Sequence, residues 1–233
     1  MPTTPLDRDV AGRALGHADA VINTALRSLR ERGGVDLNQT LACDVAHAAS
    51  ALAVAHSALD YGERGVSEAH LAAAFVATAL SGLSARVLGR ESLWGAGPDW
   101  FEPLRPFVET YGAPSFLAPL AEVVGERHLD SDLAMLSSTF RRFAEREIRP
   151  HAEHVHRTNA DVPESVIEGL RDLGAFGLSI PEEYGGAAPT DGGSHLAMVV
   201  ATEELSWGSL AIGGSLITRP EILTRALLRG GTE

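Results

Sequence analysis

The sequence has no lysine, a single cysteine and few aromatic residues. All 19 basic residues are arginine and stand against 31 acidic residues, so the formal net charge is −12 at pH 7. Nucleic acids prefer a basic protein face, so this charge balance predicts no nucleic-acid partner. Cys43 cannot form an internal disulfide, and residues 1–10 lack the pattern of a signal peptide. Together these absences predict a protein of the reducing cytoplasm.

Long apolar runs and familiar short motifs are also missing. No stretch of 18 apolar residues free of charge occurs, which predicts no membrane span. The G-x-G-x-x-G, Walker, C-x-x-C and H-E-x-x-H patterns are absent, so the functions that depend on those motifs have no support. The hydrophobic content of 45% in 233 residues is nevertheless sufficient for a core without disulfides.

The pattern that is present is helical. Alanine, the best helix former, accounts for 35 residues, and apolar residues recur at spacings of three and four. We therefore expect an all-α fold. We expect three parts: a helical extension at 1–91, a Pro/Gly-rich connecting region with short helices at 92–129, and a second helical domain at 130–233.

Turn and capping residues predict where the helices of the extension begin and end. The first should run from about Leu6 to Arg32, before two glycines. Asp36 should cap the second helix and Ser67 the third, and these two helices should form an antiparallel hairpin. The expected inner face of the second helix consists of Ala42, Ala46, Ala49, Ala53, His56 and Leu59.

The last hundred residues carry further boundary signals. Asp130 or Ser131 should cap a long helix, and Pro163 should precede a helix at 164–173. A loop is expected at 181–193, followed by helices near 194–207 and 212–229. Pro220 and the preceding glycines should interrupt or delay the last helix.

Several polar residues invite a functional interpretation that the residue pattern does not favour. The histidines at 151, 154 and 156 do not share one helical face, so a metal site is not expected. The adjacent Glu203 and Glu204 diverge by about 100° on a helix, so they cannot share one proton. Cys43 and Trp207 are expected in the core. No metal ligand and no catalytic residue is assigned.

Four sequence blocks occur in an informative order from residue 133 onward. They read FRRFAEREIRPHAE, VPESVIEGLRDLGAFGLSIPEEYGG, ATEELSWGSLAIGG and ALLRGGTE. This order strongly resembles the N-terminal helical domain of the acyl-CoA dehydrogenases, and the resemblance covers residues 130–233.

The resemblance implies a flavoenzyme that converts an acyl-coenzyme A thioester into its 2,3-unsaturated product. FAD would accept the hydride, and electrons would pass to an electron-transferring flavoprotein. Family members have a β-domain and a helical bundle after this domain, and the resemblance implies a homo-oligomer, either a dimer or a tetramer. The chain is therefore expected to be an incomplete, inactive part of such an enzyme. A non-catalytic helical interaction module is the alternative.

The extension and one segment suggest a narrower resemblance. An added helical extension is similar to that of the (2S)-methylsuccinyl-CoA dehydrogenases, which implies oxidation of (2S)-methylsuccinyl-CoA to mesaconyl-CoA. By its position, the segment 216–221 corresponds to the acyl end of the family's pocket. The resemblance thus makes Thr218, Arg219 and Ser215 candidate substrate-binding residues. Arg219 either binds the free carboxylate of the substrate or pairs with Glu221 or another surface group.

Overall fold

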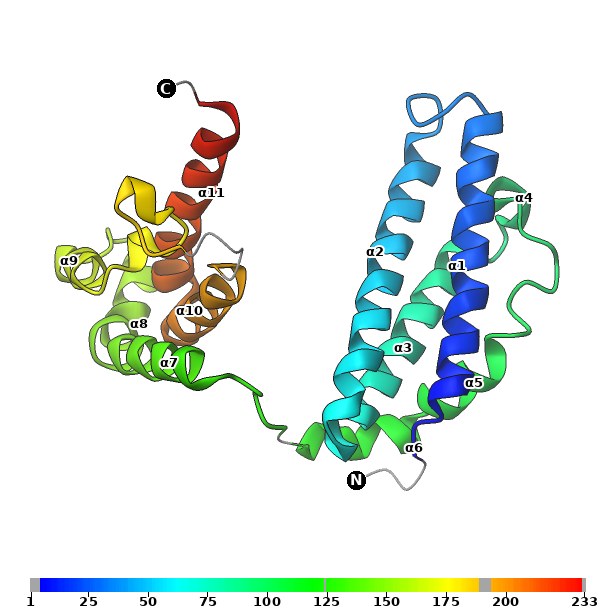
Figure 1. Cartoon of the computed structure of the whole chain (residues 1–233), viewed down its shortest axis with the longest axis horizontal. Helices are drawn as coiled ribbons and strands as arrows, with labels where there is room; N and C mark the ends of the chain where they lie inside the picture. Colours follow the sequence, from blue (N-terminus) through cyan, green and yellow to red (C-terminus); the bar gives the residue numbers. More distant parts are fainter. Residues whose placement is uncertain (1–4, 124, 189–193, 232–233) are drawn as a thin grey trace. The chain divides into compact units, whose positions relative to one another are not determined.

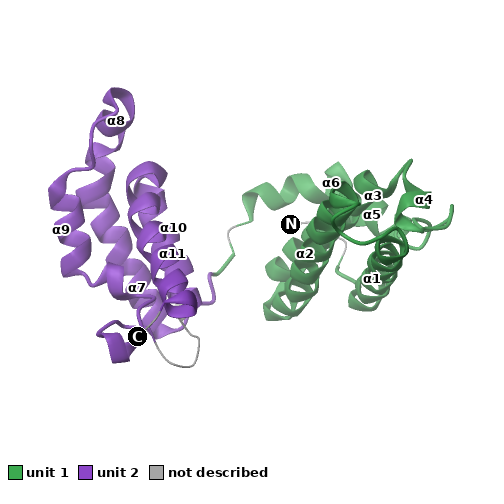
Figure 2. Cartoon of the chain, turned by 90° about the horizontal axis from the view of Figure 1, so that it is seen from above, with its two compact units in different colours: residues 1–126 green, residues 127–233 purple. Residues whose placement is uncertain are grey.

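The computed structural model of the chain describes residues 5–123, 125–188 and 194–231 (Figure 1). The chain divides into two compact units, residues 1–126 and residues 127–233 (Figure 2). The described residues form helices and turns, and the one β-type contact among them is an isolated bridge between Pro181 and Ala188. The all-α prediction is therefore confirmed for this part of the chain, whereas the three-part division of the sequence stays a prediction.

Unit 1 is built on three long helices that lie side by side (Figure 1). They are α1 (Arg8–Glu31), α2 (Gln39–Tyr61) and α3 (Val66–Val87), and a 3₁₀ turn (Gly62–Arg64) joins the last two. The short connections make successive helices antiparallel, so the predicted hairpin of α2 and α3 is confirmed. Gly33 and Gly34 have φ angles of 94° and 86°, which explains why two glycines follow α1.

Short helices complete the core of unit 1. They are α4 (Glu91–Trp94), α5 (Arg105–Tyr111) and α6 (Pro114–Leu117), followed by a 3₁₀ turn (Ala118–Glu122). Trp94, Phe107 and Tyr111 are buried in the same core as the long helices. The Tyr111 hydroxyl donates to the Pro5 carbonyl at 2.9 Å and accepts from the Asp7 amide at 3.1 Å. Aromatic side chains between the proline and glycine breakers thus bind this region to the long helices.

Four predictions for unit 1 are wrong. Neither Asp36 nor Ser67 caps a helix; Asn38 and Gly65 occupy those positions without a side-chain cap. The inner face of α2 consists of Leu41, Val45, Ala48, Leu52, Ala55 and Leu59, so the larger side chains replace most of the predicted alanines. Cys43 is exposed because it lies off this face. His56 is also exposed, and its Nε2 lies 2.9 Å from Asp19 Oδ2 on α1.

Helix α3 is long and apolar enough to cross a membrane by length and composition alone. The same composition is typical of a helix that fills the centre of a folded domain, and half of the most apolar window of α3 is buried. Val76, Leu80 and Leu83 belong to the core of unit 1. The apolar side chains of α3 therefore pack inside the helical bundle.

Unit 2 begins with a capped helix. The Asp130 carboxylate accepts a hydrogen bond from the Leu133 amide at 2.8 Å, which confirms the predicted cap of α7 (Ser131–Phe143). A π-helical turn (Ala144–Ile148) leads into α8 (Arg149–Thr158), so the helix passes Pro150 in its first turn. Pro163 is the N-cap of α9 (Glu164–Asp172). Two 3₁₀ turns follow, at Ala175–Gly177 and Glu182–Tyr184.

Two helices close unit 2. They are α10 (Ser194–Gly208) and α11 (Ser215–Gly230), separated by a π-helical turn (Leu210–Gly214). The glycines at 213 and 214 delay the start of α11 as predicted, whereas Pro220 lies inside the helix without ending it. The core consists of Phe140, Ala144, Ile148, Val166, Leu170, Ala175, Met198, Ala201, Leu205, Ile212 and Ile217.

Candidate functional site

The carboxylate of Glu204 is the centre of a buried charge cluster in unit 2. Its side chain extends from α10 and is 1% exposed. It accepts hydrogen bonds from Ser137 Oγ at 2.7 Å and from Arg141 Nε at 2.5 Å, both on α7. Arg127 also donates to it and pairs with Glu203 through its second terminal nitrogen. A buried carboxylate is tolerated here because two guanidinium groups and one hydroxyl satisfy it.

These contacts determine the protonation of the cluster. Burial raises the pKa of the Glu204 carboxyl, but the hydrogen bonds from Ser137, Arg127 and Arg141 together lower it below its ordinary value. The hydrogen bond to Glu204 raises the pKa of Arg127. Glu204 is therefore a carboxylate at neutral pH, and because its oxygens are already occupied, it serves as a structural acceptor.

Trp207 lies at the end of α10, and the guanidinium groups of two arginines contact its ring. The Cζ atom of Arg141 is 3.9 Å from the centroid of its ring, and that of Arg149 is 4.5 Å away. The residue is 41% exposed, so the prediction that Trp207 belongs to the core is wrong. Cation–π contacts with the two arginines hold it at the surface instead.

A surface pocket of about 470 Å³ contains one of the predicted site residues. Its lining combines an apolar part with carboxyl and hydroxyl groups; the residues are His195, Met198, Val199, Thr202, Glu203, Thr218 and Glu221. Glu221 pairs with Arg225, which lies 3.1 Å from His195 Nδ1. The pocket therefore lies between α10 and α11, and both carboxylates that line it have an arginine partner.

The structure does not bring the three candidate substrate residues together at this pocket. Thr218 lines it, although its hydroxyl donates to the Gly214 carbonyl at 2.8 Å. Arg219 is exposed and is not among the lining residues, and it has no ion pair among the described residues. Ser215 is half-buried at the first position of α11. Consecutive helical residues diverge by about 100°, which explains why Thr218 and Arg219 face different directions.

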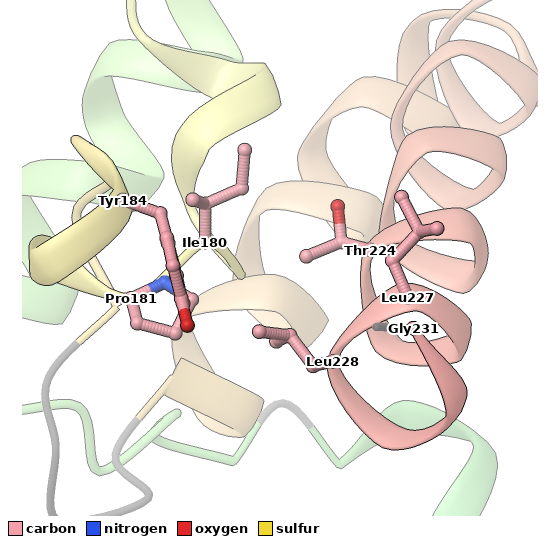
Figure 3. Close-up of a pocket in the computed structure, with 7 residues that line it drawn as sticks. All are labelled: Ile180, Pro181, Tyr184, Thr224, Leu227, Leu228 and Gly231. Atoms are coloured by element: carbon pink, nitrogen blue, oxygen red, sulfur yellow. The ribbon is translucent and has the colours of Figure 1, made fainter. Parts of the chain in front are cut away.

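A second pocket lies between the loop after α9 and the end of α11. Its volume is about 850 Å³, and its lining residues are Ile180, Pro181, Tyr184, Thr224, Leu227, Leu228 and Gly231. Figure 3 shows the Tyr184 ring opposite the α11 side chains. Among the described residues, the lining offers two hydroxyl groups and no charged side chain. This pocket suits an apolar group rather than an anion.

Comparison with known proteins tests the resemblance of the last hundred residues. Residues 130–233 match the family described as "Acyl-CoA dehydrogenase, N-terminal domain". The described residues of this segment are helical, as the resemblance implied. The predicted resemblance of residues 130–233 to the acyl-CoA dehydrogenase N-terminal domain is therefore confirmed.

Several curated proteins are similar to this chain. The (2S)-methylsuccinyl-CoA dehydrogenase of Cereibacter sphaeroides is 38% identical over 141 residues, which cover 57% of this chain and 25% of that protein. The glutaryl-CoA dehydrogenase of Desulfococcus multivorans is 36% identical over 85 residues, which cover 36% of this chain and 21% of that protein.

The 3-(aryl)acrylate reductase of Clostridium sporogenes is 37% identical over 93 residues, which cover 40% of this chain and 23% of that protein. The chain thus spans about a quarter of the length of these relatives.

The dehydrogenase domain contains functional groups that sequence reasoning placed incorrectly or missed. Arg127 lies 77 positions from its partner Glu204, so no local pattern connects them. The sequence feature that could have indicated this cluster is the adjacent pair Glu203 and Glu204, since one member of such a pair on a helix can lie on the buried face. Among the described residues, no group of three or more His, Cys, Asp or Glu side chains could hold a metal ion.

Proposed function

We propose that this chain is the N-terminal part of an FAD-dependent acyl-CoA dehydrogenase that introduces a 2,3 double bond into a short acyl-CoA. The observation that carries the proposal is the match of residues 130–233 to the N-terminal domain of that family. Three of the relatives at 36–38% identity have names that refer to a coenzyme A thioester dehydrogenase or to a reductase of an unsaturated acid. These names describe chemistry at a carbon–carbon bond next to a carbonyl group.

The substrate that we propose is (2S)-methylsuccinyl-CoA, with mesaconyl-CoA as the product. The alignment with the methylsuccinyl-CoA enzyme covers 57% of this chain, which is more than residues 130–233 provide. Part of the similarity therefore extends beyond the family domain into the preceding residues. An exposed arginine without an ion pair, Arg219, is available for a free carboxylate, and its neighbour Thr218 lines the pocket between α10 and α11.

FAD would supply the hydride acceptor when bound, but the described residues do not form a complete site for it. The described residues that line the pocket of about 850 Å³ include no charged side chain to neutralise a pyrophosphate. We therefore assign neither a flavin contact nor a catalytic base to this chain. Electron transfer to an electron-transferring flavoprotein, assembly into a homo-oligomer and a cytoplasmic location belong to the same proposal.

The test compares two proteins from one gene. The 233-residue chain and the complete product of the gene would be assayed with FAD, methylsuccinyl-CoA and an artificial electron acceptor. We expect turnover by the complete product and none by the 233-residue chain. A stop codon directly after the codon for Glu233, together with no flavin binding, would contradict the enzyme proposal and support a non-catalytic interaction module.

The carboxylate hypothesis is tested in the complete enzyme by Arg219→Leu. A lost charge-assisted hydrogen bond is worth about 1.5 to 3 kcal/mol, so KM for methylsuccinyl-CoA should rise by roughly 10- to 150-fold. Butyryl-CoA has no free carboxylate, so its KM should change little. The exposed Arg157, which pairs with Glu153 on α8, provides the control substitution Arg157→Leu. Equal effects of Arg219→Leu on both substrates would remove Arg219 from the substrate site.

A further inference from the structure

Arg127 lies at an unusual position in the sequence. It is the first residue of unit 2 and precedes the family domain, which begins at residue 130. The described residues from 125 to 130 form no helix. The side chain of Arg127 is 40% exposed, yet it reaches the carboxylate of Glu204, which is 1% exposed.

The guanidinium group of Arg127 contacts two carboxylates. One terminal nitrogen donates to Glu204 and also to Ser137 Oγ, at 2.8 Å in the second case. The other terminal nitrogen pairs with Glu203. A guanidinium group suits this arrangement because its planar, fixed nitrogens can bind two carboxylates at once.

The two carboxylates differ in their surroundings. Glu204 is buried, whereas the side chain of Glu203 is largely exposed and lines the pocket between α10 and α11. Arg127 therefore connects the segment before α7 with both a buried and a solvent-facing group of α10. Because Arg141 also binds Glu204, that carboxylate keeps a cationic partner when Arg127 is removed.

We propose that Arg127 is a latch that holds the segment preceding α7 onto α10 through Glu203 and Glu204. The latch fixes the first residues of unit 2 against α10. The contact of Arg127 with Glu203 lies at the pocket between α10 and α11, because Glu203 lines that pocket. This inference does not depend on the substrate or on the activity of the enzyme, since it concerns only the attachment of residues 127–130.

The experiment measures backbone order at His128 and Leu129 by ¹⁵N relaxation in the 233-residue chain. In the unaltered protein the order parameter of these two residues should be about 0.85, and in Arg127→Met it should fall below about 0.6. Arg127→Lys keeps the charge but not the planar fork, so an intermediate value is expected. Arg157→Met, which breaks an exposed ion pair on α8, is the matched control and should leave both residues rigid.

A second variant protects the test against loss of folding. If Arg127→Met unfolds unit 2, the double variant Arg127→Met with Glu204→Gln removes the buried charge, which has then lost one of its two arginine partners, together with the latch. We then expect a folded unit 2 with low order at residues 128 and 129. Three results would overturn the proposal: mobile residues 128 and 129 in the unaltered protein, unchanged order in the folded latch variants, or an equal loss of order in Arg157→Met.

Discussion

At the scale of single residues, the buried carboxylate of Glu204 makes the stability of unit 2 dependent on pH. Its pKa in the folded state lies below the ordinary value of 4.5, so its contribution is fully present above that pH. Stability should then decrease as the pH falls through the folded-state pKa, because protonation removes the pairing with Arg127 and Arg141. Urea unfolding at a series of pH values from 7 downward, followed by circular dichroism, measures this loss.

The variant Glu204→Gln separates the effect of this residue from general acid sensitivity. Both arginine partners of Glu204 are partly exposed, so loss of its charge should cost about 1 to 3 kcal/mol at pH 7, and the variant should show a flatter dependence on pH. The exposed Glu153, which pairs with Arg157, gives the control Glu153→Gln. A variant at Glu204 that retained the pH dependence of the unaltered protein would show that another group causes it.

Gly169 on α9 offers a second prediction at this scale. A Cβ added there would lie 2.5 Å from Cε2 of the Phe143 ring, so Gly169→Ala should destabilise unit 2 by about 1 to 3 kcal/mol through overpacking. The same substitution at Gly12 on α1 meets no atom within 4 Å and should instead stabilise the helix by about 0.5 to 1 kcal/mol. Thermal unfolding of both variants checks the opposite signs.

At the scale of helices, the capping residues can be distinguished by mutation. Asp130→Ala should lower the stability of unit 2 by about 1 kcal/mol, because the Leu133 amide loses its acceptor. Asp36→Ala should have almost no effect, since Asp36 caps no helix. Urea midpoints of the two variants provide the measurement, and equal losses would contradict the assignment of the caps.

The helices also show what the sequence could and could not predict. The existence of the long helices and the cap at Asp130 followed from periodicity and local chemistry. The inner face of α2 did not, because alanine and leucine occur on several faces and only packing against α1 and α3 selects Leu41, Val45 and Leu52. Pro220 did not end α11, since the contacts of the surrounding helix outweigh the loss of one backbone hydrogen bond.

At the scale of the whole molecule, each unit has its own core, so each should respond separately to core mutations. Leu80 in unit 1 and Ile148 in unit 2 are fully buried. Leu80→Ala and Ile148→Ala should each cost about 2 to 5 kcal/mol, and each should shift one of two unfolding transitions. Differential scanning calorimetry measures both transitions, and a common shift of both in either variant would contradict independent unfolding.

The candidate site could be predicted only in part at this scale. The ordered blocks after residue 133 were enough to indicate the family, and the match of residues 130–233 agrees with them. The contacts of Arg127 with Glu203 and Glu204 required the fold, because they join positions that are far apart in the sequence. The substrate roles of Thr218, Arg219 and Ser215 stay predictions.

The exposed side chain of Cys43 makes the chain simple to label. It is the only thiol, and it lies on the outer surface of α2. A maleimide fluorophore should therefore attach at one defined place in unit 1, without any engineered cysteine. Such a dye would report on the tumbling of the extension while the dehydrogenase domain remained unmodified.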